Sequence, residues 1–197
     1  NASLKGVKEV LNVAMERIDA RMRGEQSDGA VDSGFSELDG MTGGLRGSEL
    51  LILAARPSMG KTAFAMNIAE NVAMRGNSPV LFVSLEMSAI ELIERMMCSV
   101  ARVNGHRLRN GTISQEDRKK LVEKAAEISE SPLYIDDAPG RTVAEIAAAA
   151  RRIKRIEKNS SDRPSPLGLI VIDYLQLVEP DNPRDPRQEQ VAKIARR

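Results

Sequence analysis

One stretch of the sequence decides the fold: Glu49-Leu-Leu-Ile-Leu-Ala-Ala-Arg-Pro-Ser-Met-Gly-Lys-Thr62. An apolar run of strand length, Leu50 to Ala55, leads into a loop of small residues, and a helical pattern follows Thr62. Strand, loop and helix in this order are the setting of a phosphate-binding P-loop, because the loop and the helix start both present unpaired backbone N–H groups. We therefore expect nucleotide phosphates to bind at this loop.

The residues of this loop predict specific roles. Lys61 can bring a mobile charge to the β- and γ-phosphates, and the Thr62 hydroxyl can ligate Mg²⁺. The first position of the usual pattern, G-x-x-x-x-G-K-[ST], holds Ala55, the least demanding replacement for glycine where φ is negative. The alternative is a buried strand with an ordinary turn before a helix. The residues expected to contact the nucleotide are Arg56, Pro57, Ser58, Met59, Gly60, Lys61, Thr62 and Ala63.

The composition is that of a globular domain with some appendage. The chain has 197 residues, of which 42% are hydrophobic and 29% are charged. No apolar run approaches the length of a membrane span, and the N-terminus lacks a signal-peptide core. The net charge of +1 gives no global attraction to nucleic acid, so such binding must come from local patches. The single cysteine, Cys98, excludes internal disulfides and suits a reducing cytoplasm, and the single histidine, His106, leaves no zinc cluster.

Apolar runs and helical patterns alternate along the chain. Strands are expected at 50–55, 79–86, 132–136 and 167–173, and helices at 61–75, after 88, at 114–130 and after 142. Capping boxes open two of these helices, with Ser88 and Glu91 in one and Thr142 and Glu145 in the other. The segments 31–47 and 105–111 are expected to be loops. Alternating strands and helices predict an α/β fold, a mainly parallel doubly wound sheet with helices on both faces.

The N-terminal 30 residues predict a helix and a flexible linker, set apart from a domain that covers residues 31–197. A helical apolar stripe is formed by Leu4, Val7, Leu11, Ala14 and Ile18. Ser3 can cap the start of this helix, and Gly24 can end it. The stripe must be buried either on the chain's own domain or on a neighbouring subunit, and the pattern alone does not decide between them.

Two carboxylates are expected at the edge of the sheet where ligands bind, beyond the carboxyl ends of the strands. Asp173 ends an aliphatic run, as a Walker B residue does, and is placed to hold Mg²⁺ or its water shell; the alternative is a surface or helix-capping aspartate. Glu86 follows the second strand and can orient and deprotonate an attacking water. That role indicates a hydrolytic motor rather than a GTPase switch; the alternative is that Glu86 only helps to start the helix that Ser88 caps.

A cluster of cations marks the end of the helix that begins after Thr142. Its members are Arg151, Arg152, Lys154, Arg155 and Lys158. Cations in a last turn suit the helix dipole, so a solvated face is the leading interpretation and a DNA contact the other. The five aromatic residues lie mostly at apparent core positions, so we expect Lys and Arg side chains to track a nucleic-acid backbone without base stacking.

Four motifs together resemble the motor domain of the bacterial replicative helicases, the DnaB family. They are Gly34-Phe-Ser-Glu-Leu-Asp39, Ala54-Ala-Arg-Pro-Ser-Met-Gly-Lys-Thr62, Ser84-Leu-Glu-Met-Ser88 and Val171-Ile-Asp-Tyr-Leu-Gln-Leu177. The resemblance runs from about Val31 to the C-terminus, and the family shares the alanine at position 55. It implies a RecA-like ATPase that forms a hexameric ring, uses ATP and Mg²⁺, and moves along single-stranded DNA in the cytoplasm. Primase and a helicase loader are the implied partners.

The resemblance also assigns roles to residues. It makes Lys61 and Thr62 the Walker A pair, Glu86 the catalytic base and Asp173 the Walker B ligand. It favours docking of the N-terminal helix on the neighbouring subunit. In the family, further parts of the motor lie past the position of Arg197, among them a strand between the Walker A and Walker B strands and an arginine finger. We therefore expect this chain to behave as a fragment that binds nucleotide and turns it over barely, if at all.

Two other functions fit the same motifs. A strand-exchange or clock-type RecA relative would switch partners without unwinding DNA. A non-catalytic, nucleotide-gated scaffold would recruit partner proteins and bind nucleotide without turnover.

Overall fold

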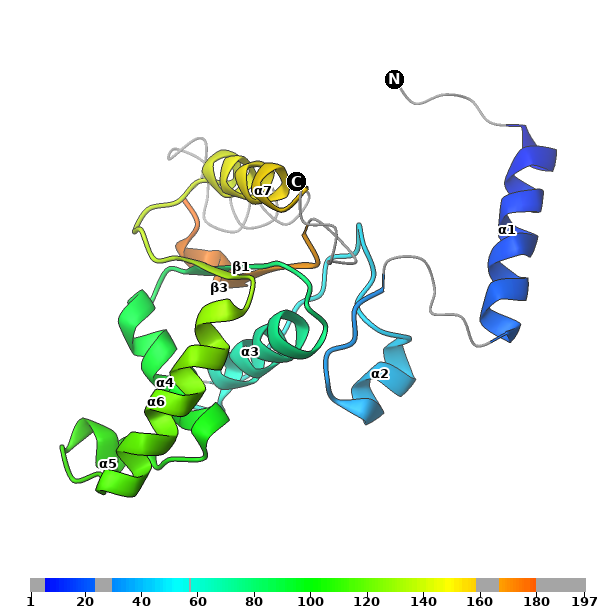
Figure 1. Ribbon diagram of the computed structural model, residues 1–197. Coiled ribbons are helices and arrows are strands. Elements are labelled where there is room, and N and C mark those ends of the chain that lie inside the picture. Colours follow the sequence, from blue (N-terminus) through cyan, green and yellow to red (C-terminus); the bar gives the residue numbers. More distant parts are fainter. Residues whose placement is uncertain (1–5, 24–29, 57, 159–166, 180–197) are drawn as a thin grey trace.

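The core of the fold is a parallel sheet of three strands (Figure 1). The structure is a computed structural model that describes residues 6–23, 30–56, 58–158 and 167–179. The strands are β1 (Val80–Ser84), β2 (Leu133–Asp136) and β3 (Leu169–Asp173), and their order is β2-β1-β3. Val80 lies opposite Leu133 on one side and Leu169 on the other. The predicted parallel α/β architecture is confirmed.

Helices cover both faces of this sheet. The side chains of β1 alternate between the two faces, so each face carries apolar residues that must be buried. Val80 and Phe82 pack against the helices on one face, and Leu81 and Val83 pack toward the other. The first face carries α3 (Lys61–Glu70), the π-helical turn η1 (Asn71–Arg75), α4 (Ala89–Ala101) and α6 (Gln115–Glu130); the second carries α7 (Val143–Glu157). In Figure 1, α7 lies above the sheet, and α3, α4 and α6 lie below it. The two hydrophobic cores thus hold β1 from both sides.

Both predicted capping boxes are confirmed. Ser88 accepts a hydrogen bond from the backbone N–H of Glu91, whose carboxylate in turn accepts from the Ser88 backbone N–H. Thr142 and Glu145 make the same reciprocal pair at the start of α7. These boxes satisfy N–H groups that a helix leaves unpaired in its first turn, so they fix where α4 and α7 begin.

Two segments expected to be loops contain short helices. The segment 31–47 contains α2 (Ser36–Thr42), and Asp39 accepts hydrogen bonds from the N–H groups of Ser33 and Gly34. The segment 105–111 contains α5 (Gly105–Arg109), where the Asn104 side chain accepts from the next helical N–H groups. The loop prediction was wrong in both places, because both helices have too few apolar residues to show a period; α5 has a side-chain cap, whereas α2 has none.

The N-terminal helix is confirmed as α1 (Val7–Met22), with its large apolar side chains exposed. Val7 and Leu11 have exposed fractions of 75% and 57%, and Figure 1 shows α1 standing apart from the layered body. The predicted capping residues Ser3 and Gly24, and Leu4 of the stripe, lie outside the described residues. The structure therefore shows this apolar stripe unburied within the chain.

The strand expected at residues 50–55 is not formed. These residues have no regular secondary structure, and Leu50, Leu51, Ile52 and Leu53 are all exposed. Within the described part of the chain, β3 pairs with β1 alone and no strand pairs with residues 50–55. A strand is stabilised by hydrogen bonds to a neighbouring strand, so an apolar run without one stays irregular despite its composition.

Candidate nucleotide-binding site

Three of the predicted site residues meet at the carboxyl edge of the sheet. The Thr62 hydroxyl donates a hydrogen bond of 2.6 Å to Oδ2 of Asp173. The Lys61 ammonium lies 3.2 Å from Oδ1 of the same carboxylate, which is buried. Both oxygens of Asp173 therefore contact P-loop side chains, although Thr62 and Asp173 are 111 positions apart in the sequence.

The fold explains this convergence. Asp173 is the last residue of β3, and Lys61 is the first residue of α3, so both lie at the same edge of the sheet. Gly60 precedes α3 with a φ of 86°, a backbone conformation that side chains other than glycine rarely adopt. Its carbonyl accepts from the N–H of Phe64 at 2.9 Å. The N-terminus of α3 thus opens beside Asp173 with the geometry that favours an anion.

The remaining P-loop residues are exposed where the structure describes them. Arg56, Ser58 and Met59 form a turn in which the Met59 N–H donates to the Arg56 carbonyl at 3.3 Å. Ser58 has a φ of 63°. Pro57 lies outside the described residues, and Ala63 is exposed on the first turn of α3. The role of this turn as a phosphate cradle stays a prediction.

Glu86 lies at the same edge and is exposed. Ser84 of β1 is paired with Asp173, and the N–H of the next residue, Leu85, donates to the Asp173 carbonyl at 2.8 Å. The start of α4 is capped by Ser88 and Glu91, and Asp137 accepts from the Ala89 N–H at 2.7 Å. Because other residues make these capping hydrogen bonds, Glu86 is available for a role at the sheet edge.

The structure adds one residue that the sequence did not single out for the site. The ring of Tyr174 lies beneath the Lys61 ammonium, with 4.3 Å between Nζ and the ring centroid. The only sequence signal was its position directly after Asp173. The other aromatic residues pack inside the chain: Phe35 contacts Phe64, Phe82 is buried, and Tyr134 donates a hydrogen bond to Glu157.

The donor chemistry fits Mg²⁺ bound with a nucleotide. Thr62 and Asp173 supply a hydroxyl and a carboxylate oxygen side by side, the hard ligands that this ion prefers. Within the described residues no group of three or more His, Cys, Asp or Glu side chains could hold a metal ion. A site with one or two protein oxygens is typical of an ion that also binds phosphates and water.

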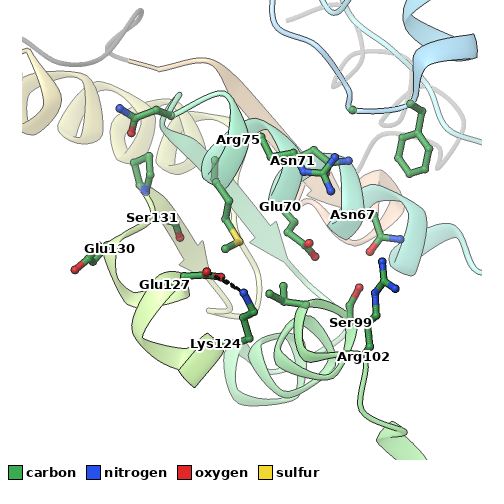
Figure 2. Close-up of a pocket in the computed structure, with 17 residues that line it drawn as sticks. Asn67, Glu70, Asn71, Arg75, Ser99, Arg102, Lys124, Glu127, Glu130 and Ser131 are labelled. Atoms are coloured by element: carbon green, nitrogen blue, oxygen red, sulfur yellow. Dashed lines mark hydrogen bonds and ion pairs between the residues drawn. The ribbon is translucent and has the colours of Figure 1, made fainter. Parts of the chain in front are cut away.

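A cavity of about 800 Å³ lies elsewhere, among η1, α4 and α6 and the second half of α3 (Figure 2). Glu70 points into it, and its Oε2 atom is buried without a hydrogen-bond partner. Burial raises the pKa of the Glu70 carboxyl, an effect that the charge of Arg75 opposes. Lys124 on the cavity wall pairs with Glu127 at 2.8 Å. Lys61, Thr62 and Asp173 do not line this cavity, so it is separate from the candidate nucleotide site.

Comparison with known proteins places this geometry in a family. Residues 30–197 match the family described as the DnaB-like helicase C terminal domain. The chain belongs to this family. It is 41% identical over 196 residues to the replicative DNA helicase DnaC of Bacillus subtilis, covering 99% of the chain and 41% of the relative. It is also 41% identical over 197 residues to the replicative DNA helicase DnaB of Geobacillus stearothermophilus, covering 100% of the chain and 42% of the relative.

Two solved structures share the fold. The ATPase domain of G40P superimposes with a TM-score of 0.83 at 36% identity, covering 98% of this chain and 66% of that one. A DnaB-like replicative helicase, described with its interactions with primase, gives a TM-score of 0.81 at 36% identity, covering 98% and 44%. The RecA-like architecture of this DnaB-like domain is thereby established.

The chain spans about two fifths of the length of these curated relatives. In the part of the chain that the structure describes, no helix is long and apolar enough to cross a membrane.

Proposed function

We propose that this chain is the nucleotide-binding part of a replicative DNA helicase motor, and that it binds ATP with Mg²⁺ between α3 and β3. The observation that carries the proposal is the convergence of Lys61 and Thr62 on the buried carboxylate of Asp173. The family match and the relatives named as replicative DNA helicases support it. In the longer protein, we propose that ATP hydrolysis drives movement along single-stranded DNA and unwinding of duplex.

Each residue has a role that its position allows. The Lys61 ammonium holds the β- and γ-phosphates, and the N–H groups at the start of α3 add to this binding. Thr62 and Asp173 would hold Mg²⁺, which would neutralise charge on the phosphates. Glu86, exposed at the same edge, accepts a proton from the attacking water. Arg56 to Ala63 supply the loop around the phosphates.

The partners of the longer protein follow from the same assignment. The exposed apolar stripe of α1 supports docking on a neighbouring subunit of a homo-hexameric ring, with residues 1–30 acting as linker helix and linker to a motor domain at 31–197. Single-stranded DNA is the proposed track, and primase and a helicase loader are proposed partners in the cytoplasm. The exposed cations at the end of α7 are candidate DNA contacts, and a solvated face that suits the helix dipole is the leading interpretation.

The test is the variant Glu86→Gln in the full-length protein. The amide keeps the shape of the side chain but cannot accept a proton from water, so nucleotide should bind with Mg²⁺ and persist. We expect turnover to fall by roughly two orders of magnitude or more. The matched control is Glu91→Gln, which changes a carboxylate of the α4 capping box. Undiminished turnover in Glu86→Gln would return Glu86 to a structural role.

Assays of unwinding, turnover and nucleotide binding on the full-length protein separate the competing functions. Unwinding of a forked duplex by the full-length protein supports the helicase assignment. Turnover without unwinding would favour a strand-exchange or clock-type relative. Nucleotide binding without turnover in the full-length protein would favour a nucleotide-gated scaffold.

A further inference from the structure

The Lys61 ammonium is held from two sides in this structure. The Asp173 carboxylate lies 3.2 Å from Nζ on one side, and the face of the Tyr174 ring lies 4.3 Å away on another. The Lys61 side chain keeps only 30% of its surface exposed. The P-loop lysine therefore rests on groups of β3 and the residue that follows it.

The backbone that carries the Tyr174 ring is fixed by its neighbours on both sides. Tyr174 directly precedes the short 3-10 helix η2 (Leu175–Leu177), and its carbonyl accepts from the Leu177 N–H at 3.0 Å. Val178, just beyond this turn, is buried in the core beneath α7. The backbone on both sides of Tyr174 is thus anchored, by the pairing of β3 with β1 and by this core.

We propose that Tyr174 is a positioning residue that holds the Lys61 ammonium beside Asp173 in the nucleotide-free site and releases it to the nucleotide phosphates. A cation over the face of an aromatic ring is attracted by the negative potential of the ring, and the attraction grows as water is excluded. A carboxylate alone would bind Lys61 in many orientations. The contact with the ring limits these orientations and keeps the ammonium in the site rather than in solvent.

This inference rests on the proposed function. It implies that nucleotide binding must break the contact between Lys61 and Tyr174, which weakens binding. If Lys61 leaves the ring when phosphates bind, the contact with Tyr174 stabilises only the nucleotide-free state. Removing the ring should then tighten nucleotide binding by about two- to fivefold, as expected for a partly exposed cation–π contact. Removing Lys61 has the opposite sign, because the charge itself is lost.

The test is an NMR measurement on the chain with ¹³Cε-labelled lysine, with the Lys61 signal assigned by Lys61→Arg. A ring beneath the side chain shields its protons, so the Lys61 Hε signals should be shifted upfield in the nucleotide-free protein. The shift should persist in Tyr174→Phe, which keeps the ring, and disappear in Tyr174→Leu. It should also disappear in the unsubstituted chain on adding a Mg²⁺-bound non-hydrolysable ATP analogue, a readout that needs no variant to fold.

The outcomes distinguish a failure of the inference about Tyr174 from a failure of the proposed nucleotide-binding function. An unshifted Lys61 signal in the nucleotide-free chain overturns the inference even if nucleotide binds normally. A shift that survives saturation with the analogue, or a Tyr174→Leu protein that binds the analogue no more tightly than Tyr174→Phe, also overturns it. Failure of the unsubstituted chain to bind the analogue at all overturns the proposed function, whether or not the shift is present.

Discussion

Two apolar runs of similar composition have opposite fates in this molecule. β1 lies between two other strands and under helices on both faces, and its side chains are buried. Residues 50–55 are as apolar in sequence, yet they form no strand, and Leu51 keeps 54% of its surface exposed. The difference teaches that apolarity selects a strand only where a neighbouring backbone completes its hydrogen bonds.

The comparison bears on function because each run leads to a candidate site residue. β1 leads to Glu86 from a buried and fully paired strand, whereas residues 50–55 lead to the P-loop from an exposed segment. The side chains of Lys61 and Thr62 are nevertheless fixed, through their contacts with Asp173. The start of α3 is thus held by the contacts that Lys61 and Thr62 make with Asp173, and not by the segment that precedes it.

The largest expected effect is on turnover. A polypeptide of residues 1–197 should turn nucleotide over far more slowly than one lengthened at its C-terminus, since residues 50–55, which lead to Lys61 and Thr62, pair with no strand of the described chain. In related NTPases an arginine finger, supplied in cis or by a partner, is worth a further factor of roughly 10³–10⁵ in rate. Steady-state ATPase assays should compare this chain with a version extended at its C-terminus by the corresponding residues of the Bacillus subtilis relative. Equal rates would show that the catalytic set is complete without the extension.

The next largest expected effect is on the free energy of unfolding. The same substitution, Leu→Ala, is made in β1 and in residues 50–55. Leu81→Ala in β1 should lower the free energy of unfolding by about 2–5 kcal/mol, because Leu81 is 2% exposed and its removal leaves a cavity. Leu51→Ala should change it by less than about 0.5 kcal/mol. Urea denaturation followed by circular dichroism measures both.

The same pair of variants in the extended protein sharpens the comparison. There Leu51→Ala should become destabilising by about 2 kcal/mol or more, because a run held in the sheet by a neighbouring strand would pack Leu51 against the helices on one face. If Leu51→Ala stays neutral in the extended protein, residues 50–55 do not join the sheet.

The smallest effect concerns association. The exposed run at 50–53 and the unpaired side of β3 in the described chain can pair with another molecule. Ile52→Lys should therefore shift the chain toward monomer in sedimentation velocity runs at increasing concentration. Met41→Lys, at a similarly exposed position on α2, is the matched control and should have no such effect. Equal sedimentation of the two variants would mean that association does not use residues 50–53.

Several parts of the fold could be predicted from the sequence because they follow local or topological rules. Ser88 with Glu91 and Thr142 with Glu145 fix two helix starts through bonds within one turn. The meeting of the α3 start with Asp173 was expected from a shared carboxyl edge of strands; the contact is present, although residues 50–55 form no strand. The sequence could not reveal α2 and α5, because both are too short to show a helical period; Asn104 caps α5, and the Asp39 side chain of α2 accepts from the backbone N–H groups of Ser33 and Gly34. The contact of Tyr174 with Lys61 depends on two side-chain orientations, which no sequence pattern encodes.

The central claim, that Lys61 and Asp173 form a nucleotide site, is tested most directly by titrating a fluorescent ATP analogue with Mg²⁺ against the chain and against Lys61→Ala. Loss of a charge-assisted contact with the phosphates should cost about 1.5–3 kcal/mol, or roughly 10- to 150-fold in Kd. Lys8→Ala, on the separate helix α1, is the matched control and should bind like the unsubstituted chain. Equal dissociation constants for the unsubstituted chain and Lys61→Ala would contradict the account.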